Sequence, residues 1–369
     1  PTLASQLRAG LVLEPEAVAT LFLSEDVSTS ELLELARERR EAEASGSGIE
    51  TFSPLYLTNE CDAECLMCGM RRDNADLHRE TAAEGTSRDQ LALLYRRGLR
   101  GVALLTGEYR LGKRRDEMMG KTRTAMRDAL AKGFTHVLIN IGSLDVGDYD
   151  ALLADIPRRA DGRLDPKLTM CTFQETYDPK VYARFMGSSS DNPRAHYRRR
   201  LENFDRAANA GFHSSNPGLL LGLNRDLAFD LIALSAHVRH LLNLDLTVYI
   251  SLPRLRKASG AEHRGGVSDD DLARAVSVLS ACFPEARVVI STRESPRIQR
   301  QLLPVIGVLT AGSPGVAPYY EDGARFDVEA SQFEVSDHRP IEEILGECLA
   351  AGFLIKDYEP SAFHQQPVG

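Results

Sequence analysis

The pattern of hydrophobic and polar positions changes its period repeatedly along the chain. From Pro54 onward, short runs rich in leucine and β-branched residues alternate with longer stretches in which apolar residues recur every three or four positions. The first pattern is typical of buried strands and the second of amphipathic helices. We predict eight strands, at Leu55–Thr58, Val102–Thr106, Val137–Ile141, Leu168–Phe173, Gly218–Leu223, Leu246–Ser251, Val288–Thr292 and Val305–Thr310.

The stretches between these strands have helical periodicity, and several of them end in glycine. The predicted helices are Arg88–Arg97, Thr122–Ala131, His196–Ala210, Leu227–Leu242 and Asp269–Cys282. Glycine is the preferred residue just beyond a helix because it adopts the left-handed conformation without strain. Repeated strand-then-helix units predict an α/β fold, a closed (β/α)8 barrel of the TIM type, with its active site at the C-terminal ends of the strands.

The two ends of the chain do not follow this alternation. Residues 1–50 have helical patterns, with an apolar face over Glu14–Leu23 and a capping signal at Ser28–Glu31 before the next apolar run. We therefore predict an N-terminal helical extension over residues 1–50, serving as a lid or plug. The barrel is assigned to residues 51–330, and residues 331–369 to a C-terminal helical tail that packs on it.

Composition narrows the class of protein. The 369 residues are 43% hydrophobic and 26% charged, which is enough to build a full core. The net charge is −9, without a sustained basic stripe, so we expect no nucleic-acid partner. No apolar run approaches the roughly 18 residues of a membrane span, and the N-terminus lacks a signal pattern. We expect a cytoplasmic protein with no membrane partner.

Three of the six cysteines form one compact array directly after the first predicted strand. Cys61, Cys65 and Cys68 follow the spacing C-x3-C-x2-C. Three thiolates can hold three irons of a cubane cluster and leave the fourth iron open to another ligand, whereas electron-transfer clusters usually take four cysteines. The alternatives are a zinc knuckle completed by His78 or a distant cysteine, and a disulfide. Structural zinc sites usually show two pairs of closely spaced ligands, and a chain of this size needs no disulfide. Both alternatives are therefore weaker than the cluster interpretation.

The cysteine spacing resembles the signature of the radical S-adenosylmethionine (radical SAM) superfamily, including the apolar Met67 before the last cysteine. The resemblance implies a 4Fe–4S cluster held by Cys61, Cys65 and Cys68, with S-adenosyl-L-methionine (SAM) chelated to the open iron. One electron then cleaves SAM to a deoxyadenosyl radical, and a flavodoxin- or ferredoxin-type reductant is implied as the electron source. The cofactors bring the difficult chemistry and the protein positions them.

Polar motifs at the ends of the predicted strands extend the resemblance. Thr106-Gly107-Glu108 resembles the Gly-Gly-Glu segment that receives the SAM ammonium, with threonine in place of the first glycine. Gln174 and Glu175 follow the fourth strand, where a carboxylate can accept hydrogen bonds from ribose hydroxyls. Arginines follow the sixth and seventh strands at Arg254 and Arg293, and the planar fork of an arginine fits a carboxylate of SAM or substrate. For each arginine alone, a structural ion pair is the competing interpretation.

Taken together, these motifs resemble the aromatic amino acid lyase branch of the superfamily over roughly residues 50 to 358. The segments nearest to the tryptophan lyases of thiopeptide antibiotic biosynthesis are 61–74, 104–110 and 170–177. The resemblance implies conversion of L-tryptophan to 3-methyl-2-indolic acid. In that reaction a hydrogen leaves the amino group, the Cα–carboxyl bond breaks and the carboxyl fragment adds to indole C2.

The same resemblance assigns individual roles. Met67 lies near the adenine, Glu175 faces the ribose and Arg200 faces the SAM carboxylate. Tyr56 and Arg293 hold the amino and carboxylate groups of tryptophan. Thr310 stands where the family has a serine that contacts the substrate, so its extra methyl group crowds the carboxylate.

Two alternatives of function remain open. One is a radical SAM lyase that acts on L-tyrosine and releases p-cresol. The other is a non-catalytic iron–sulfur or zinc protein that senses metal or redox state, which predicts no SAM cleavage.

Overall fold

The computed structural model describes residues 2–43, 48–262, 266–312 and 332–360, and the backbone of residues 319–320 and 323–324. Its strands are β1 Ile49–Glu50, β2 Ser53–Tyr56, β3 Gly101–Leu105, β4 His136–Asn140, β5 Lys167–Cys171, β6 Ser214–Asn216, β7 Thr247–Ser251, β8 Arg287–Ser291, β9 Val308–Thr310, β10 Tyr319–Tyr320, β11 Gly323–Ala324 and β12 Ile355–Lys356. Strands β10 and β11 form a small antiparallel pair apart from the main sheet.

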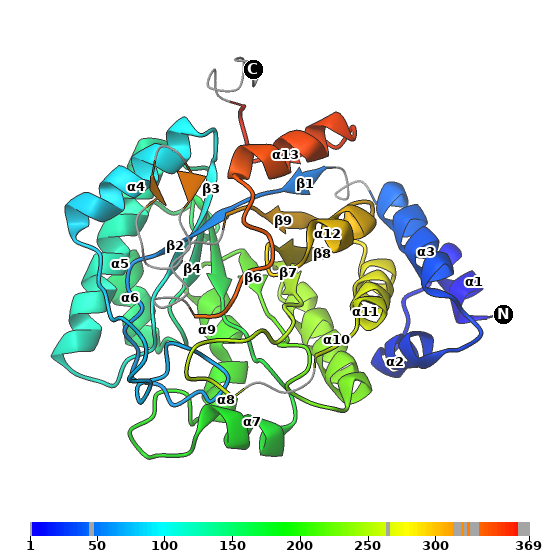
Figure 1. Ribbon diagram of the computed structural model, residues 1–369, viewed down its shortest axis with the longest axis horizontal. Coiled ribbons are helices and arrows are strands. Elements are labelled where there is room, and N and C mark those ends of the chain that lie inside the picture. The colour runs from blue at the N-terminus through cyan, green and yellow to red at the C-terminus, as the bar shows by residue number, and fades with distance from the viewer. Residues whose placement is uncertain are drawn as a thin grey trace.

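The other ten strands form one parallel sheet in the order β12-β1-β9-β8-β7-β6-β5-β4-β3-β2. Strands β1 and β2 are successive parts of one stretch of chain, residues 49–56. The start of this stretch pairs with β9 and β12, and its end pairs with β3. The sheet therefore curls into a barrel, which confirms the predicted α/β barrel architecture (Figure 1).

Helices surround this sheet. They are α1 Leu3–Arg8, α2 Pro15–Leu23, α3 Thr29–Ala42, α4 Glu84–Arg96, α5 Lys113–Lys132, α6 Val146–Leu153, α7 Pro179–Met186, α8 Tyr197–Leu201, α9 Asn203–Asn209, α10 Leu227–Asn243, α11 Asp269–Cys282, α12 Pro296–Leu302 and α13 Ile341–Ala350. Each of the five predicted helical stretches contains observed helix. The stretch over residues 196–210 divides into α8 and α9 at Glu202.

One predicted strand is misplaced. We expected the fifth strand at residues 218–223, but β6 covers Ser214–Asn216. The leucine-rich stretch after it makes only isolated bridges, such as Leu219 with Glu175 and Leu221 with Arg254. The prediction failed because β6 is polar. The side chains of Ser214 and Asn216 form hydrogen bonds inside the barrel, so β6 lacks the apolar run that marks a buried strand.

Every second residue of a barrel strand faces inward, so the interior is built in levels. In β4 the inward residues are His136, Leu138 and Asn140, in order from the N-terminal end of the strand. The middle level is apolar and consists of Phe52, Ala103, Leu138, Tyr249, Val289 and Val308. The upper level consists of residues that end their strands, and it is polar at Asn140, Cys171, Asn216, Ser251, Ser291 and Thr310. The apolar level thus forms the floor beneath a polar mouth.

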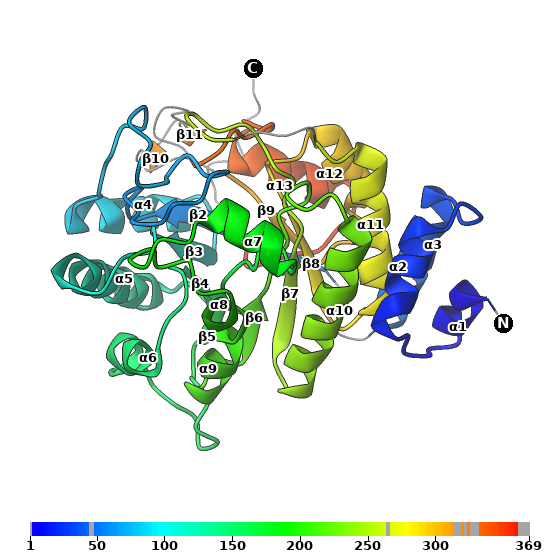
Figure 2. The ribbon, with the colours of Figure 1, turned by 90° about the horizontal axis from the view of Figure 1, so that it is seen from below.

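The N-terminal helices form a second layer outside the barrel. Helix α3 packs on α11, and α2 packs on α10 and α11 (Figure 2). The predicted cap of α3 is confirmed, because Ser28 and Glu31 form a reciprocal capping box. Arg274 of α11 donates hydrogen bonds to backbone carbonyls at the end of α2, including Ser24 at 2.7 Å. The extension therefore lies on the main domain, where it covers the side of the barrel as an outer layer of helices.

The C-terminal part contains more than the predicted helix. Helix α13 is followed by β12, which pairs with β1 in the register Ile49 with Ile355. The remaining parts of the predicted barrel and tail, at residues 313–318, 321–322, 325–331 and 361–369, lie outside the described residues. Among the described helices, none combines the length and the apolar character needed to cross a bilayer.

Candidate active site

A cavity of about 200 Å³ lies at the C-terminal mouth of the barrel. Its walls are the loop after β2, the ends of the strands and residues 332–333. Of the predicted site residues, it is lined by Tyr56, Cys61, Cys65, Met67, Cys68, Thr106, Gly107, Glu108, Glu175, Arg200, Arg293 and Thr310. Residues that lie far apart in the sequence thus share one small-molecule site.

The cysteine loop is held by backbone contacts to the neighbouring strand end. The Cys61 sulfur accepts hydrogen bonds from the backbone N–H groups of Ala63 at 3.4 Å and Glu108 at 3.3 Å. Hydrogen bonds of this kind to ligand sulfur atoms tune iron–sulfur clusters. All six cysteines of the chain are free, which excludes the disulfide interpretation for this conformation.

Gly107 is required by this close approach. A Cβ atom at Gly107 would lie 2.2 Å from the carbonyl oxygen of Glu60 and 2.6 Å from Cys61 Cβ. Any side chain would therefore push the end of β3 away from the cysteine loop. The glycine of the predicted Thr106-Gly107-Glu108 motif lets the end of β3 lie against the cysteine loop.

The outer part of the loop is fixed by two residues that sequence analysis did not single out. Arg79 donates hydrogen bonds to the carbonyl oxygens of Asn59 at 2.9 Å and Met70 at 2.8 Å. Asn74 donates to the carbonyl of Gly69 at 2.7 Å. Neither belongs to a spacing motif, so only the folded loop reveals that they fix its shape.

Burial raises the pKa of the three thiols, to about 11 for Cys61 and Cys68 and about 12 for Cys65. Without a bound metal they stay protonated at neutral pH. Cluster assembly must therefore release protons, because the thiolate is the metal ligand.

The donor set bears on the choice between a cluster and a single zinc ion. Three cysteines leave a tetrahedral zinc site one protein ligand short. His78 is exposed and does not line the cavity, so it does not complete such a site. Three thiols match the number of irons that a 4Fe–4S cluster with one open iron presents to the protein.

Next to the cysteines, two acids and two arginines form a buried network. Glu108 forms ion pairs with Arg200 and, at 3.4 Å, with Arg194, and Arg194 reaches Glu175 at 3.0 Å. Burial alone would raise the pKa of Glu108, but the positive charges of Arg200 and Arg194 outweigh burial and hold it below its ordinary value. Gly142 makes room for this arrangement, since a Cβ there would lie 2.1 Å from Glu108 Cγ.

Sequence analysis identified Glu108, Glu175 and Arg200 but missed Arg194. Arg194 stands in the irregular stretch before α8, where no motif marked it. It lines the cavity and joins the two acids, so it belongs to the same site. Glu175 has a φ of 69°, an uncommon conformation for a residue with a side chain. The network offers both charges to a zwitterion such as the methionyl part of SAM.

The other end of the cavity holds Tyr56, Arg293 and Thr310. Arg293 is partly buried, stacks on the Phe333 ring at 3.3 Å, donates to the Arg254 carbonyl at 3.4 Å, and has no carboxylate partner among the described residues. Burial lowers its pKa to about 10. The Tyr56 hydroxyl donates to Gln332 at 3.0 Å. A buried cation without an anion is costly, so this arginine is prepared for an anionic ligand.

Two predicted cofactor residues do not reach the cavity wall. Arg254 pairs with Glu294 and, at 2.7 Å, with Asp269. Gln174 is buried outside the lining residues. Arg254 is thus held in the structural ion pair that was its alternative interpretation, and Arg256, two residues later, lines the cavity instead.

The apolar wall near Met67 suits a flat ring. Met67 packs with Leu220 and Leu255, and all three line the cavity. The thiols, the zwitterion network and this wall together match the parts of SAM bound beside a cluster, so the residues present fit both cofactors.

Three comparisons with known proteins bear on the site. A family model for the Biotin and Thiamin Synthesis associated domain matches residues 251–354. The 2-iminoacetate synthase of Escherichia coli (strain K12) is 26% identical over 314 residues, which cover 83% of this chain and 77% of the relative.

Solved structures share the fold. A crystal structure of HydG, a maturase of the FeFe-hydrogenase, matches with a TM-score of 0.79 at 28% identity. The match covers 96% of this chain and 75% of the HydG chain. Methylornithine synthase (PylB) has a TM-score of 0.71 at 17% identity, over 96% of this chain and 97% of its own. The second likeness is one of fold alone.

The parallel barrel with three cysteines at its mouth is similar to the barrels of radical SAM enzymes, and the residues present fit a 4Fe–4S cluster and SAM. In sequence the chain is similar to 2-iminoacetate synthase and HydG, and it shares its fold with PylB.

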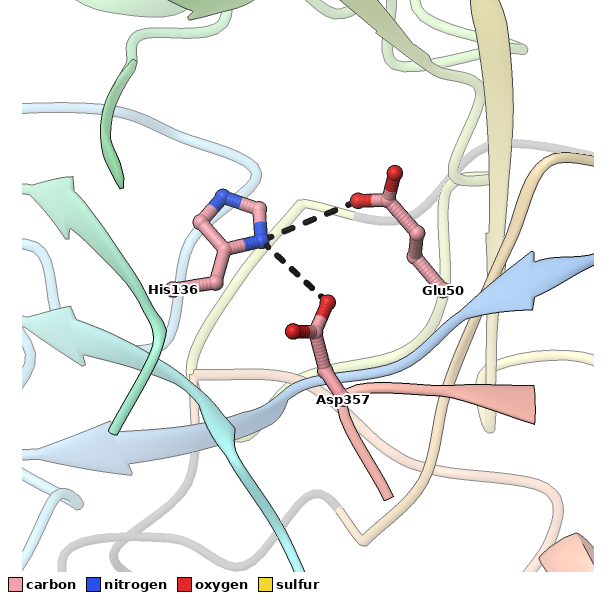
Figure 3. A group of neighbouring side chains, drawn as sticks. All are labelled: Glu50, His136 and Asp357. Atoms are coloured by element: carbon pink, nitrogen blue, oxygen red, sulfur yellow. Dashed lines mark ion pairs between the residues drawn. The ribbon is translucent and has the colours of Figure 1, made fainter. Parts of the chain in front are cut away.

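A second cluster of ligand-type residues lies at the opposite end of the barrel. Figure 3 shows the carboxylates of Glu50 and Asp357 pointing at Nδ1 of His136, at 3.8 and 3.9 Å. The Ser214 hydroxyl donates to the Leu168 carbonyl, so Thr169 must donate to Ser214 and accept from His136 Nε2. Neutral His136 therefore presents a lone pair at Nδ1, between two acids.

Three acceptors at one point suggest a cation, but neighbouring charges oppose a metal. Lys167 and Arg287 each lie 2.9 Å from a Glu50 oxygen, and the Tyr249 hydroxyl donates to Glu50 at 2.7 Å. Two buried acids thus already face two cations, and a divalent ion would add unbalanced charge. We assign the cluster to joining β12 to the floor of the barrel.

This cluster predicts acid-sensitive stability. Burial lowers the pKa of His136 below its ordinary 6.5, although Asp357 and Glu50 oppose the shift. The unfolded chain therefore takes up the proton first, and the free energy of unfolding should fall as the pH drops through about 6.5, by up to about 1.4 kcal/mol per pH unit.

Urea unfolding of wild type and His136→Asn at several pH values between about 7.5 and 5 measures how much His136 contributes to the pH dependence of the free energy of unfolding. The variant should show a flatter profile over that range. Equal slopes for the two proteins would contradict the assignment to His136. Glu50 and Asp357, whose pKa values are also lowered, contribute further losses at lower pH in both proteins.

Proposed function

We propose that the protein is a radical SAM tryptophan lyase that converts L-tryptophan to 3-methyl-2-indolic acid for thiopeptide antibiotic biosynthesis. The observation that carries the proposal is Arg293, a partly buried arginine that lines the cavity without a described carboxylate partner. An amino acid substrate supplies that carboxylate. The carboxyl carbon moves to indole C2, and the Cα and nitrogen leave together as an imine, so all atoms are accounted for.

The chain's own residues orient the amino acid. Arg293 pairs with the substrate carboxylate through its planar fork, and the Phe333 ring beneath it keeps that fork in one plane. Tyr56, at the end of β2, faces the amino group. Holding a reactant in one pose is worth several orders of magnitude in rate.

The residues around the cysteines hold the cofactors. Cys61, Cys65 and Cys68 are the cluster ligands, Glu108 and Thr106 lie at the SAM ammonium, and Arg200 lies at its carboxylate. Bound together and supplied with an electron by a flavodoxin- or ferredoxin-type reductant, the cofactors provide radical hydrogen abstraction. Glu175 serves the ribose, and Arg194 keeps Glu175 and Glu108 in place.

The inner levels of the barrel confine the aromatic ring. Phe52, Leu138 and Val289 form an apolar floor that excludes water below the ring. A dry, closed site keeps a reactive fragment from being quenched before it adds to the ring. The apolar floor therefore suits a migration reaction.

A lyase acting on L-tyrosine is the second candidate, favoured by the 26% identity to 2-iminoacetate synthase. The product in that name keeps the nitrogen, the Cα and the carboxylate of an amino acid, so that relative cleaves the bond to the side chain. The two candidates share the Arg293 site and differ in the ring and in the bond that breaks.

The test is an anaerobic assay of reconstituted protein with SAM, dithionite and either L-tryptophan or L-tyrosine, read by mass spectrometry. 5′-Deoxyadenosine with 3-methyl-2-indolic acid from tryptophan supports the proposal. p-Cresol from tyrosine, without the indolic acid, replaces it by the second candidate. Bound zinc and no deoxyadenosine with either amino acid would indicate a non-catalytic metal or redox sensor.

Thr310 provides a finer prediction about confinement of the fragment. It is buried at the end of β9, lines the cavity and pairs with Ser291 of β8. Thr310→Ser keeps the hydroxyl and removes a methyl group beside the carboxylate site. The extra space should lower the ratio of rearranged product to simple cleavage products severalfold, measured by mass spectrometry at equal protein. An unchanged ratio would mean that the methyl is neutral.

A further inference from the structure

We propose that Asn140 determines ring specificity, because its carboxamide oxygen accepts the N–H of an indole. This inference rests on the proposed function, since it concerns the same substrate site. Asn140 lies outside the cysteine loop and outside the network of acids and arginines. It is also separate from Tyr56, Arg293 and Thr310, which we call the head-group site because they face the amino and carboxylate groups of the proposed substrate.

The strand order places Asn140 across the barrel from the head-group site. Arg293 follows β8, while Asn140 ends β4. Going round the sheet, β4 lies four strands from β8 through β7, β6 and β5, and four strands through β9, the β1–β2 stretch and β3. The two residues therefore stand on opposite walls of the same cavity. An amino acid held by its carboxylate at Arg293 directs its side chain toward β4.

The Asn140 side chain is available for a ligand. It is half-buried, lines the cavity, and its carboxamide has no hydrogen bond to any described residue. Asn216, two strands away, shows the contrast: its amide donates to Tyr249 at 2.7 Å and Ser251 at 2.9 Å, and its oxygen accepts from Cys171 at 3.2 Å. Asn216 is thus fully used by the protein, whereas Asn140 is not.

The surroundings of Asn140 make a polar contact selective. Leu105 is its register partner on β3, and Leu138 lies below it, so Asn140 stands where the polar mouth meets the apolar floor. A polar group that a bound ring covers discriminates strongly, because a ligand without a matching group leaves it buried and unpaired. Indole offers one N–H donor and no acceptor, which matches the amide oxygen.

The chain itself makes the test direct, because it contains no tryptophan. Bound L-tryptophan is then the indole fluorophore, and its anisotropy, excited to the red of tyrosine absorption, reports binding. The measurement uses anaerobically reconstituted protein with SAM and without reductant, so no turnover occurs. Displacement by 3-benzothienyl-L-alanine, which replaces the N–H by sulfur, gives the affinity for a ring without a donor.

Wild type should bind tryptophan about three- to tenfold more tightly than the analogue, as expected for one hydrogen bond. Asn140→Leu should bind the two ligands equally. Asn140→Asp keeps an acceptor and should keep the preference, and it also serves if the leucine variant fails to fold. Arg293→Leu, the matched control on the opposite wall, should lose both ligands together.

Each other outcome overturns the inference. Equal affinities in wild type, or an unchanged preference in Asn140→Leu, would remove Asn140 as the discriminating residue while leaving the lyase proposal intact. A loss of SAM binding in Asn140→Leu would assign the residue to the cofactor. Failure of wild type to bind either ligand would overturn the tryptophan substrate and this inference with it.

Discussion

Replacing Cys65 by alanine is expected to abolish the cluster and, with it, SAM cleavage by more than about a hundredfold. Cys65 is the most buried of the three thiols and stands between the other two in the loop. With two thiolates left, the loop cannot hold three irons of a cubane. The measurements are iron content, the visible absorption band that dithionite bleaches, and 5′-deoxyadenosine formed from SAM.

Cys282→Ala is the matched control for this prediction. Cys282 is also a free, buried thiol, but it lies in helix α11 within the main hydrophobic core. Its loss should cost some stability and leave the iron content and SAM cleavage unchanged. A Cys65→Ala protein that keeps full iron and cleavage would contradict the cluster assignment.

Replacing Arg293 by leucine is expected to raise the tryptophan concentration needed for turnover by more than about a hundredfold. Loss of one member of a buried charge pair costs about 3–5 kcal/mol, which corresponds to at least that factor. The cluster should remain intact, because Arg293 makes no described hydrogen bond to the cysteine loop. Binding measured with tryptophan fluorescence, and the visible spectrum of the cluster, separate the two effects.

The same variant should leave the ligand-free protein as stable as wild type or more stable, because it removes a partly buried charge that has no described carboxylate partner. Arg254→Leu is the matched comparison, since Arg254 is buried as well but pairs with the buried Glu294. That variant leaves Glu294 short of a partner and should lower the free energy of unfolding by about 3 kcal/mol. Denaturant unfolding that ranks the two variants the other way round would contradict the assignment of Arg293 to an anion site.

Much of the barrel could be predicted from local pattern. Seven of the eight strands were placed by their apolar runs, and the capping box at Ser28 marked the start of α3. The exception is β6. Its residues Ser214 and Asn216 are buried because they form hydrogen bonds to other strands, so the polar sequence did not predict a buried strand. Periodicity reports burial in apolar surroundings, not burial in a hydrogen-bonded interior.

The candidate site divides in the same way. The cysteine spacing and the motifs after the strands are local, and strand ends of a parallel barrel meet at one mouth, so the sequence by itself placed most of the predicted site residues at one cavity. The sequence could not determine which acidic side chain each arginine would pair with. Arg254 and Arg293 looked equivalent, and only the fold gave Glu294 to the first and left the second without a described carboxylate.

Arg194, Asn140 and the Glu50–His136–Asp357 cluster likewise emerged only from the tertiary structure. Each depends on contacts between segments brought together by strand order. The sequence therefore determined the barrel, the array of three cysteines and the position of the mouth. The tertiary structure decided which charges are neutralised and which are left for a ligand, because ion pairing and desolvation depend on distances across the fold and not on spacing along the chain.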